Sequence, residues 1–156
     1  MWRTRLLAAL GIILICSLAG LGRSSRLKRP EIPTVNFCEL TSHPEKYTDK
    51  LVRTEASYLG WWESSLLYNE ACVKGMHVHN APDCPDDNKR CLKRFASEWR
   101  KLDPYMRSKE DDGGNTISRV RAVFIGRLVG PGEYGHLNGF RYEFRIKAVE
   151  SASSIP

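Results

Sequence analysis

Apolar and polar residues alternate along two segments of the chain, as they do in strands that bury one face. Residues 51–59 alternate in this way, with an inward face made of Val52, Thr54, Ala56 and Tyr58. Residues 140–148 alternate most clearly, with an inward face made of Phe140, Tyr142, Phe144, Ile146 and Ala148. The opposite face of this last strand is charged, which is typical of a strand in an antiparallel sheet with one face in water.

Three further segments are predicted to be strands. Residues 65–70 offer a second strand with Leu66 and Tyr68 facing inward, and residues 75–79 a short third one. Residues 116–129 form a long strand rich in β-branched residues, in which Gly126 marks a bulge. Residues 111–115 and 130–139 are polar and contain glycine, which predicts loops, and residues 151–156 are predicted to be a disordered tail.

Two helices complete the pattern. Asn36, with Glu39 three residues later, forms a capping box for a short helix over residues 37–42, and Pro44 begins a turn after it. Residues 89–102 carry one apolar stripe at helical spacing and follow the acidic and capping residues 86–88. The stripe, which should face the core, consists of Leu92, Phe95, Trp99 and Leu102.

The order of elements predicts a mainly β fold with one or two helices. Three strands, a helix and two long strands joined as a hairpin match a small five-stranded antiparallel barrel of the oligonucleotide/oligosaccharide-binding (OB) type, whose helix follows the third strand. Closure into a barrel also removes open sheet edges. We place this domain at residues 34–150. A chain of 156 residues with 42% apolar content excludes a disordered protein, a two-domain enzyme and a multi-span membrane protein.

The N-terminal segment has the three parts of a signal peptide. Arg3 and Arg5 precede an uncharged stretch over residues 6–22, and Ser17 and Ala19 place small residues where a signal peptidase cleaves. We therefore predict a signal peptide over residues 1–19 and a basic, disordered linker over residues 20–33. The alternative is an uncleaved membrane anchor formed by residues 6–22. Either way the barrel is exported, and we expect it to be periplasmic or secreted.

The net charge of +6 belongs to the N-terminal segment. Residues 1–29 hold six basic residues and no acidic one, so residues 30–156 hold 18 of each sign. A domain without net charge lacks the excess of positive charge that phosphate binding usually needs, which argues against a nucleic-acid partner. Residues 89–109 contain eight basic residues, which we interpret as a solvated helix face rather than an anion-binding strip.

The cysteines fit an oxidising compartment. Besides Cys16 in the leader, the chain has four cysteines, which allow three pairings that sequence alone does not distinguish. We favour Cys38 with Cys72, which ties the first helix to the barrel, and Cys84 with Cys91, which closes a short loop. The alternative is a zinc site made of His77, His79, Cys84 and Cys91. Its spacing fits no standard zinc finger, so we expect neither a metal nor another cofactor.

Several short segments resemble a group of small exported bacterial proteins of unknown function. They are Cys38-Glu-Leu, His43-Pro-Glu-Lys-Tyr, Lys50-Leu-Val-Arg-Thr, Ser65-Leu-Leu-Tyr, Cys72 and Tyr134-Gly-His-Leu-Asn-Gly-Phe-Arg-Tyr. The resemblance covers residues 36–149, implies an OB-like barrel and carries no catalytic residues across. Residues 75–114, with Cys84 and Cys91, depart from the pattern of this group.

Candidate ligand-binding residues lie in two predicted loops. Trp61 and Trp62 follow the first strand, where OB barrels often bind ligands, although they could equally pack over the barrel mouth. The second loop could contribute a ligand-contacting lip or be plain surface, and its candidates are Tyr134, His136 and Asn138.

Two functions are compatible with these residues. We favour a monomeric, non-catalytic binding module of the cell envelope, with a protein, peptide or glycan as partner. Contact with the membrane would come only through an uncleaved N-terminal segment. The alternative is a metal-assisted enzyme that uses His77, His79 and His136. The sequence contains no standard nucleophile, zinc-protease, phosphate-binding or dinucleotide-binding motif.

Overall fold

The computed structural model describes residues 31–72, 77–85, 87–110 and 113–155. Residues from Ile32 onward form one unit. The predicted signal peptide and almost all of the predicted linker lie outside the described residues. At the end of that linker, Pro33 is already part of the sheet, because its carbonyl accepts a hydrogen bond from the backbone N–H of Arg53. Within the described ranges, no helix is long and apolar enough to span a membrane.

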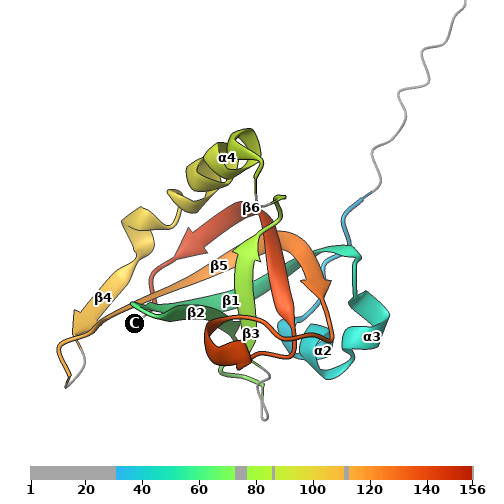
Figure 1. Ribbon diagram of the computed structural model, residues 1–156, viewed down its shortest axis with the longest axis horizontal. Helices are drawn as coiled ribbons and strands as arrows, with labels where there is room; N and C mark the ends of the chain where they lie inside the picture. Colours follow the sequence, from blue (N-terminus) through green and yellow to red (C-terminus); the bar gives the residue numbers. More distant parts are fainter. Residues whose placement is uncertain (1–30, 73–76, 86, 111–112, 156) are drawn as a thin grey trace, which may run out of the picture. The chain divides into compact units, whose positions relative to one another are not determined.

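Five strands close into a barrel, and they are β1 (Leu51–Trp61), β2 (Ser64–Tyr68), β3 (Val78–Pro82), β5 (Thr116–Val129) and β6 (Glu143–Ser153). The sheet runs in the order β1-β2-β3-β6-β5, and β5 pairs back onto β1. Helix α4 (Lys89–Trp99) follows the third strand (Figure 1). The predicted small OB-like barrel is thus confirmed, since strand order, closure and the place of the helix all agree with it.

One pair of barrel strands is not antiparallel. Strands β3 and β6 pair in parallel, with His79 opposite Glu143 and Pro82 opposite Ile146. Neighbouring strands in a closed ring can alternate in direction only when their number is even. A barrel of five strands must therefore contain a parallel pair, and the sheet is mixed rather than wholly antiparallel.

The structure adds a strand that the sequence pattern did not predict. Strand β4 (Arg107–Glu110) pairs with residues 116–119 of β5 at the edge of the sheet. Helix α4 ends at Trp99, and a 3₁₀ turn over Asp103–Tyr105 leads into β4. Pro104 lies in this turn, where it cannot continue an α-helix. Two residues of the predicted basic helix face, Arg107 and Lys109, consequently lie on a strand.

Three strand boundaries differ from the prediction. Strand β6 begins at Glu143, and Phe140 instead forms an isolated bridge with Tyr134 in the preceding loop. The prediction of a disordered tail is wrong for residues 151–153, which extend β6 and pair with residues 121–123 of β5. Strand β3 covers Val78–Pro82 and so extends beyond the predicted end at residue 79, while residues 75 and 76 of the predicted strand lie outside the described residues. The extension of β6 is explained by its long partner strand β5, which supplies hydrogen bonds beyond the segment that carries the apolar pattern.

The predicted irregularity at Gly126 is present. Ile125 pairs with Ala148 and Gly126 with Ile146, so Lys147 on β6 has no opposite residue. A Cβ atom on Gly126 would lie 2.3 Å from the carbonyl oxygen of Arg145.

The barrel interior holds the main core. Its largest fully buried side chains include Phe37, Phe124, Phe144, Leu67, Leu102 and Ile146. The inward face predicted for β1 is confirmed for Val52, Thr54 and Ala56. In β2 the inward-facing residue differs from the prediction. Leu67, opposite Val78, lies in the core, whereas Leu66 is buried outside the main cluster and Tyr68 is half-buried.

Short helices cover the barrel. Asn36 caps α2 (Phe37–Ser42) as predicted, but Glu39 accepts a hydrogen bond from the Tyr47 hydroxyl instead of completing a capping box. Pro44 begins α3 (Pro44–Tyr47). From α4, Phe95 and Trp99 pack against the core, and Trp99 meets the ring of Tyr58 edge-on. The helical part of the apolar stripe is half-buried, and the fully buried Leu102 lies just beyond the helix.

Candidate functional site

Two loops of the barrel come together at the side chains of Glu63 and His136. Glu63 lies in the turn between β1 and β2, and His136 lies in the long loop between β5 and β6. The Nε2 atom of His136 lies 3.8 Å from Oε2 of Glu63, and both side chains are partly exposed. The two loops that were predicted separately to bind a ligand therefore lie side by side. The corresponding loops commonly contact ligands in OB barrels.

Two large apolar side chains beside this pair point into solvent. Trp62 is 73% exposed and Leu137 is 86% exposed. Trp62 precedes Glu63 and Leu137 follows His136, so each is adjacent in sequence to one of these two polar residues. We call these four residues, Trp62, Glu63, His136 and Leu137, the rim. These two residues, Trp62 and Leu137, are the largest exposed apolar side chains on the two loops, which makes the rim a candidate interaction site.

The backbone of the rim is strained. Leu137 has a φ of 54° and Asn138 a φ of 56°, both in the left-handed region that residues with a side chain rarely adopt. Such a conformation costs roughly 1–2 kcal/mol per residue. The surrounding loop therefore holds Leu137 in its exposed position at a cost in stability, and such strained residues cluster at binding sites.

The other predicted residues have different places. Trp61 is half-buried at the end of β1, so only its neighbour Trp62 is exposed as a binding side chain. Tyr134 is half-buried, and its backbone exchanges two hydrogen bonds with Phe140. Asn138 is exposed and donates its amide to Glu133. Tyr134 and Asn138 thus shape the loop, whereas His136 and Trp62 belong to the rim itself.

Sequence reasoning missed Glu63 and Leu137. Leu137 carries a signal that could have been used, because it is an aliphatic residue inside a polar, glycine-containing loop where no core position is expected. Glu63 carries no such signal, since its role depends on a loop more than 70 residues away in the chain.

A polar cluster lies behind the long loop. His79 of β3 places Nδ1 3.0 Å from Oε2 of Glu143, and Arg145 donates from Nε to Oε1 of the same carboxylate at 2.9 Å. Among the described residues, Glu143 is the one charged residue that is buried, at 8% exposure. The ring of Phe140 packs against His79, with 5.8 Å between centroids. The carboxylate is held from both sides, so it anchors the loop and the adjoining strands.

Hydrogen bonding controls the ionisation of this cluster. The hydrogen bond with His79 is the main reason why the pKa of Glu143 lies below its usual value, and Arg145 lowers that pKa further against the opposing effect of burial. The same carboxylate raises the pKa of Arg145. Glu143 is therefore ionised near neutral pH, and it accepts hydrogen bonds rather than donating a proton.

We expect Glu143→Gln to destabilise the barrel in a pH-dependent way. A lowered pKa means that ionised Glu143 stabilises the fold above its usual pKa of 4.5, and that this contribution disappears as the pH falls through the lower pKa of the folded state. The variant should be less stable by about 2 kcal/mol at neutral pH. Urea unfolding measured from about pH 7 to about pH 3 should show that the difference in free energy of unfolding between the unchanged chain and the variant shrinks below about pH 4.5. A difference that stays constant over this range would contradict the assignment.

The predicted metal ligands lie in separate environments. Cys84 and Cys91 form a disulfide and so supply no thiolate. His77 packs edge-on against Tyr68, His79 contacts Glu143, and His136 contacts Glu63. In the part of the chain that the structure describes, no group of three or more His, Cys, Asp or Glu side chains is arranged to hold a metal ion.

Both predicted disulfide pairings are confirmed. Cys38 is bonded to Cys72, and Cys84 to Cys91. Two disulfides in one small domain are typical of proteins that fold in an oxidising, exported environment.

No family model, no curated protein and no solved structure matches this chain. Since an OB-like barrel hosts many activities, the function has to be inferred from the rim and its chemistry rather than from the fold.

Proposed function

We propose that this chain is an exported, non-catalytic binding module of the cell envelope, periplasmic or secreted, and that its partner contacts the rim. The observation that carries the proposal is the exposure of Trp62 and Leu137 on two loops that Glu63 and His136 join. Tryptophan is among the residues that contribute most to binding energy at interfaces. Glu63 and His136 supply polar groups at which a partner can be oriented.

The chemistry of the rim favours a peptide or protein segment as the partner. An indole ring can stack on a sugar or pack against an apolar side chain, but an aliphatic side chain such as Leu137 favours apolar groups. Residues 30–156 carry equal numbers of basic and acidic side chains, which gives no general attraction for a polyanion. The proposed partner therefore presents an apolar side chain to Trp62 and Leu137.

Alanine variants test this proposal. The full chain, with its disulfides intact, is immobilised and exposed to an envelope extract, and the captured protein is compared for Trp62→Ala, Leu137→Ala and the unchanged chain. We expect each variant to lower retention of the same partner at least about tenfold. Tyr105→Ala is the matched control, because Tyr105 is also a large exposed side chain, at 42%, but lies in the turn after α4.

Stability measurements separate binding from folding. Because Trp62 is mostly in solvent, Trp62→Ala should change the free energy of unfolding by no more than about 0.5 kcal/mol. A loss as large as that of a core truncation would mean that Trp62 packs on the barrel. Equal retention by the rim variants and the Tyr105 control would overturn the proposed site.

A further inference from the structure

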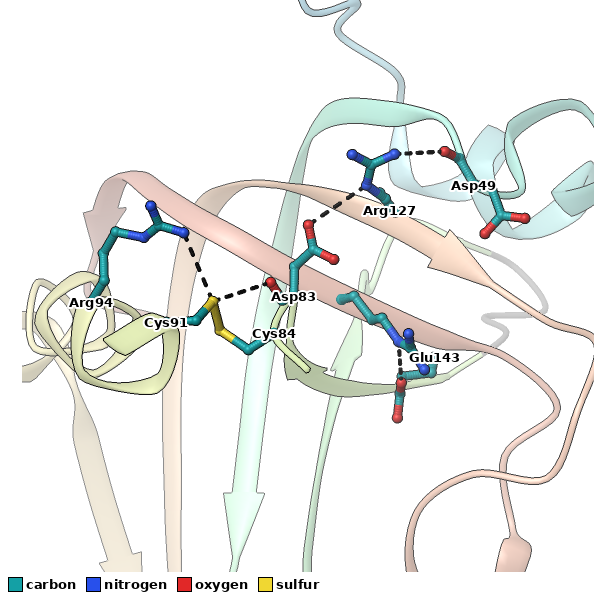
Figure 2. Close-up of polar contacts among 8 residues, drawn as sticks. Asp49, Asp83, Cys84, Cys91, Arg94, Arg127 and Glu143 are labelled. Atoms are coloured by element: carbon teal, nitrogen blue, oxygen red, sulfur yellow. Dashed lines mark hydrogen bonds and ion pairs between the residues drawn. A yellow bond between two sulfur atoms is a disulfide. The ribbon is translucent and has the colours of Figure 1, made fainter. Parts of the chain in front are cut away.

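The Cys84–Cys91 disulfide lies beside a pocket away from the rim. This pocket has a volume of about 500 Å³ and is lined by Asp83, Pro85, Asn88, Arg90, Cys91 and Arg94. Both cysteines are half-buried rather than enclosed in the core. Figure 2 shows the disulfide between the end of β3 and the start of α4, with Arg94 directed at the sulfur of Cys91. The pocket therefore gives room around the sulfur of Cys91, whereas Cys84 does not line it and is partly exposed to solvent, from which a small thiol or a peptide thiol can approach.

Positive groups surround the sulfur of Cys91. A guanidinium nitrogen of Arg94 lies 3.8 Å from Sγ, and Arg90 lines the same pocket. Cys91 is the third residue of α4, whose cap, Asn88, accepts a hydrogen bond from the Cys91 backbone N–H. The first turn of this helix contains no acidic residue. A thiolate at Cys91 would thus be stabilised by a guanidinium group and by the helix dipole.

The carboxylate of Asp83, a residue that lines the pocket, is paired with another side chain. The carboxylate of Asp83 lies 3.6 Å from Nε of Arg127, which also donates to the backbone carbonyl of Asp49 (Figure 2). The group that Asp83 presents to Cys91 is its carbonyl oxygen, 3.6 Å from Sγ. Cys84, in contrast, precedes Pro85 in the segment between β3 and α4 and lies outside the helix. The two sulfurs are therefore unequal, and Cys91 is the better leaving group.

We propose that Cys84–Cys91 is a thiol-exchange site that accepts two electrons from a dithiol. A thiolate of the dithiol attacks Sγ of Cys84, a mixed disulfide forms, and the Cys84–Cys91 bond breaks with its electron pair left on Cys91 as thiolate. The second thiol of the dithiol, as thiolate, then attacks the first sulfur of the dithiol in the mixed disulfide, and the bond to Cys84 breaks with its electron pair left on Cys84 as thiolate. The dithiol becomes a disulfide, and its two protons end on the protein thiols or in solvent.

Several contacts other than the Cys84–Cys91 disulfide hold α4 and the residues after it on the barrel. Helix α4 is also attached through Glu98, which accepts from the backbone N–H of Val149, and through Lys101, which donates to the Val149 carbonyl. Trp99 packs on Tyr58. Cys38–Cys72 is different, because Cys72 packs against the core and Cys38 lies in a short helix beside Glu39. Cys38–Cys72 therefore serves as an internal control for Cys84–Cys91 in the same chain.

Differential alkylation of the full chain tests the proposal. The oxidised protein is incubated with reduced glutathione or with dithiothreitol, free thiols are trapped over time, and each cysteine is measured by mass spectrometry. We expect Cys84–Cys91 to open at least about tenfold faster than Cys38–Cys72, with glutathione attached to Cys84 rather than Cys91. Equal rates for the two disulfides, or glutathione found on Cys91, would overturn the proposal.

The electrostatic cause is tested separately with two neighbouring residues. In the reduced protein, the rate of Cys91 alkylation is measured as a function of pH. It should reach half its maximum at a pH below the ordinary thiol pKa of about 8.5. Arg94→Gln should move this midpoint upward and slow the opening of the disulfide. Lys93→Gln is the matched control, since Lys93 is an exposed lysine of the same helix that does not line the pocket, and it should leave both quantities unchanged. Equal effects of the two variants would contradict the assigned role of Arg94.

Discussion

Replacing both Cys38 and Cys72 with serine should lower the free energy of unfolding by about 4 kcal/mol. The two cysteines are 34 residues apart, and their bond joins α2 to the segment after β2. Closing a loop of this length restricts the unfolded chain strongly, which is the main source of the stabilisation. Cys72 also packs against the core, so the variant loses apolar contact as well.

The other disulfide provides the comparison. Cys84 and Cys91 are only 7 residues apart, so replacing both with serine should cost about 2.5 kcal/mol in the same model. Urea unfolding of the two double variants and the unchanged chain, under one set of conditions, measures both losses. The loop-length explanation fails if the short-loop variant is the less stable of the two.

A methyl group at Gly126 should be nearly as damaging. Gly126→Ala should cost about 3 kcal/mol, because the new Cβ would lie 2.3 Å from the Arg145 carbonyl oxygen and 2.6 Å from the ring of Phe144. The carbonyl belongs to the backbone of β6, which cannot move away without disturbing the pairing of β5 and β6. Since this pair is part of the closed barrel, the strain falls on the whole core.

Gly139→Ala is the control for this substitution. Gly139 has a φ of −73°, and a Cβ there would meet one atom, the His136 carbonyl oxygen, at 3.3 Å. The change should stay within about 1 kcal/mol, as expected for glycine to alanine at an ordinary backbone position. Thermal and urea unfolding of both variants decide the question, and similar stabilities would show that β5 and β6 do not approach as closely as described.

The barrel could be predicted because its long strands carry a strong local pattern. Alternation in residues 51–59 and 140–148 identified most of β1 and β6, and β-branched residues identified β5. Strand β4 was missed because its four residues are all exposed, so no apolar face marks it. The last residues of β6 are Ser151, Ala152 and Ser153, whose small side chains give no strand signal. They are ordered by pairing with β5, which is a tertiary effect.

The site was only partly predictable for a related reason. Trp62 and His136 were identified from residue type and loop position, but their placement on one rim depends on a contact between distant loops. Glu143 occupies the charged face of a strand that alternates, which suggested solvent exposure. It is buried instead, because the long loop returns over β3 and brings Phe140 against His79, the partner of Glu143. Local periodicity does not contain that information.

The central claim is that a partner binds at the rim, and site-specific photo-cross-linking tests it most directly. A photoreactive aromatic residue is placed at position 62, 137 or 105 of the full chain, and the living cells are irradiated. The account predicts one covalent adduct of the same partner from positions 62 and 137, and none from position 105. Adducts from position 105 alone, or none from either rim position, would contradict it.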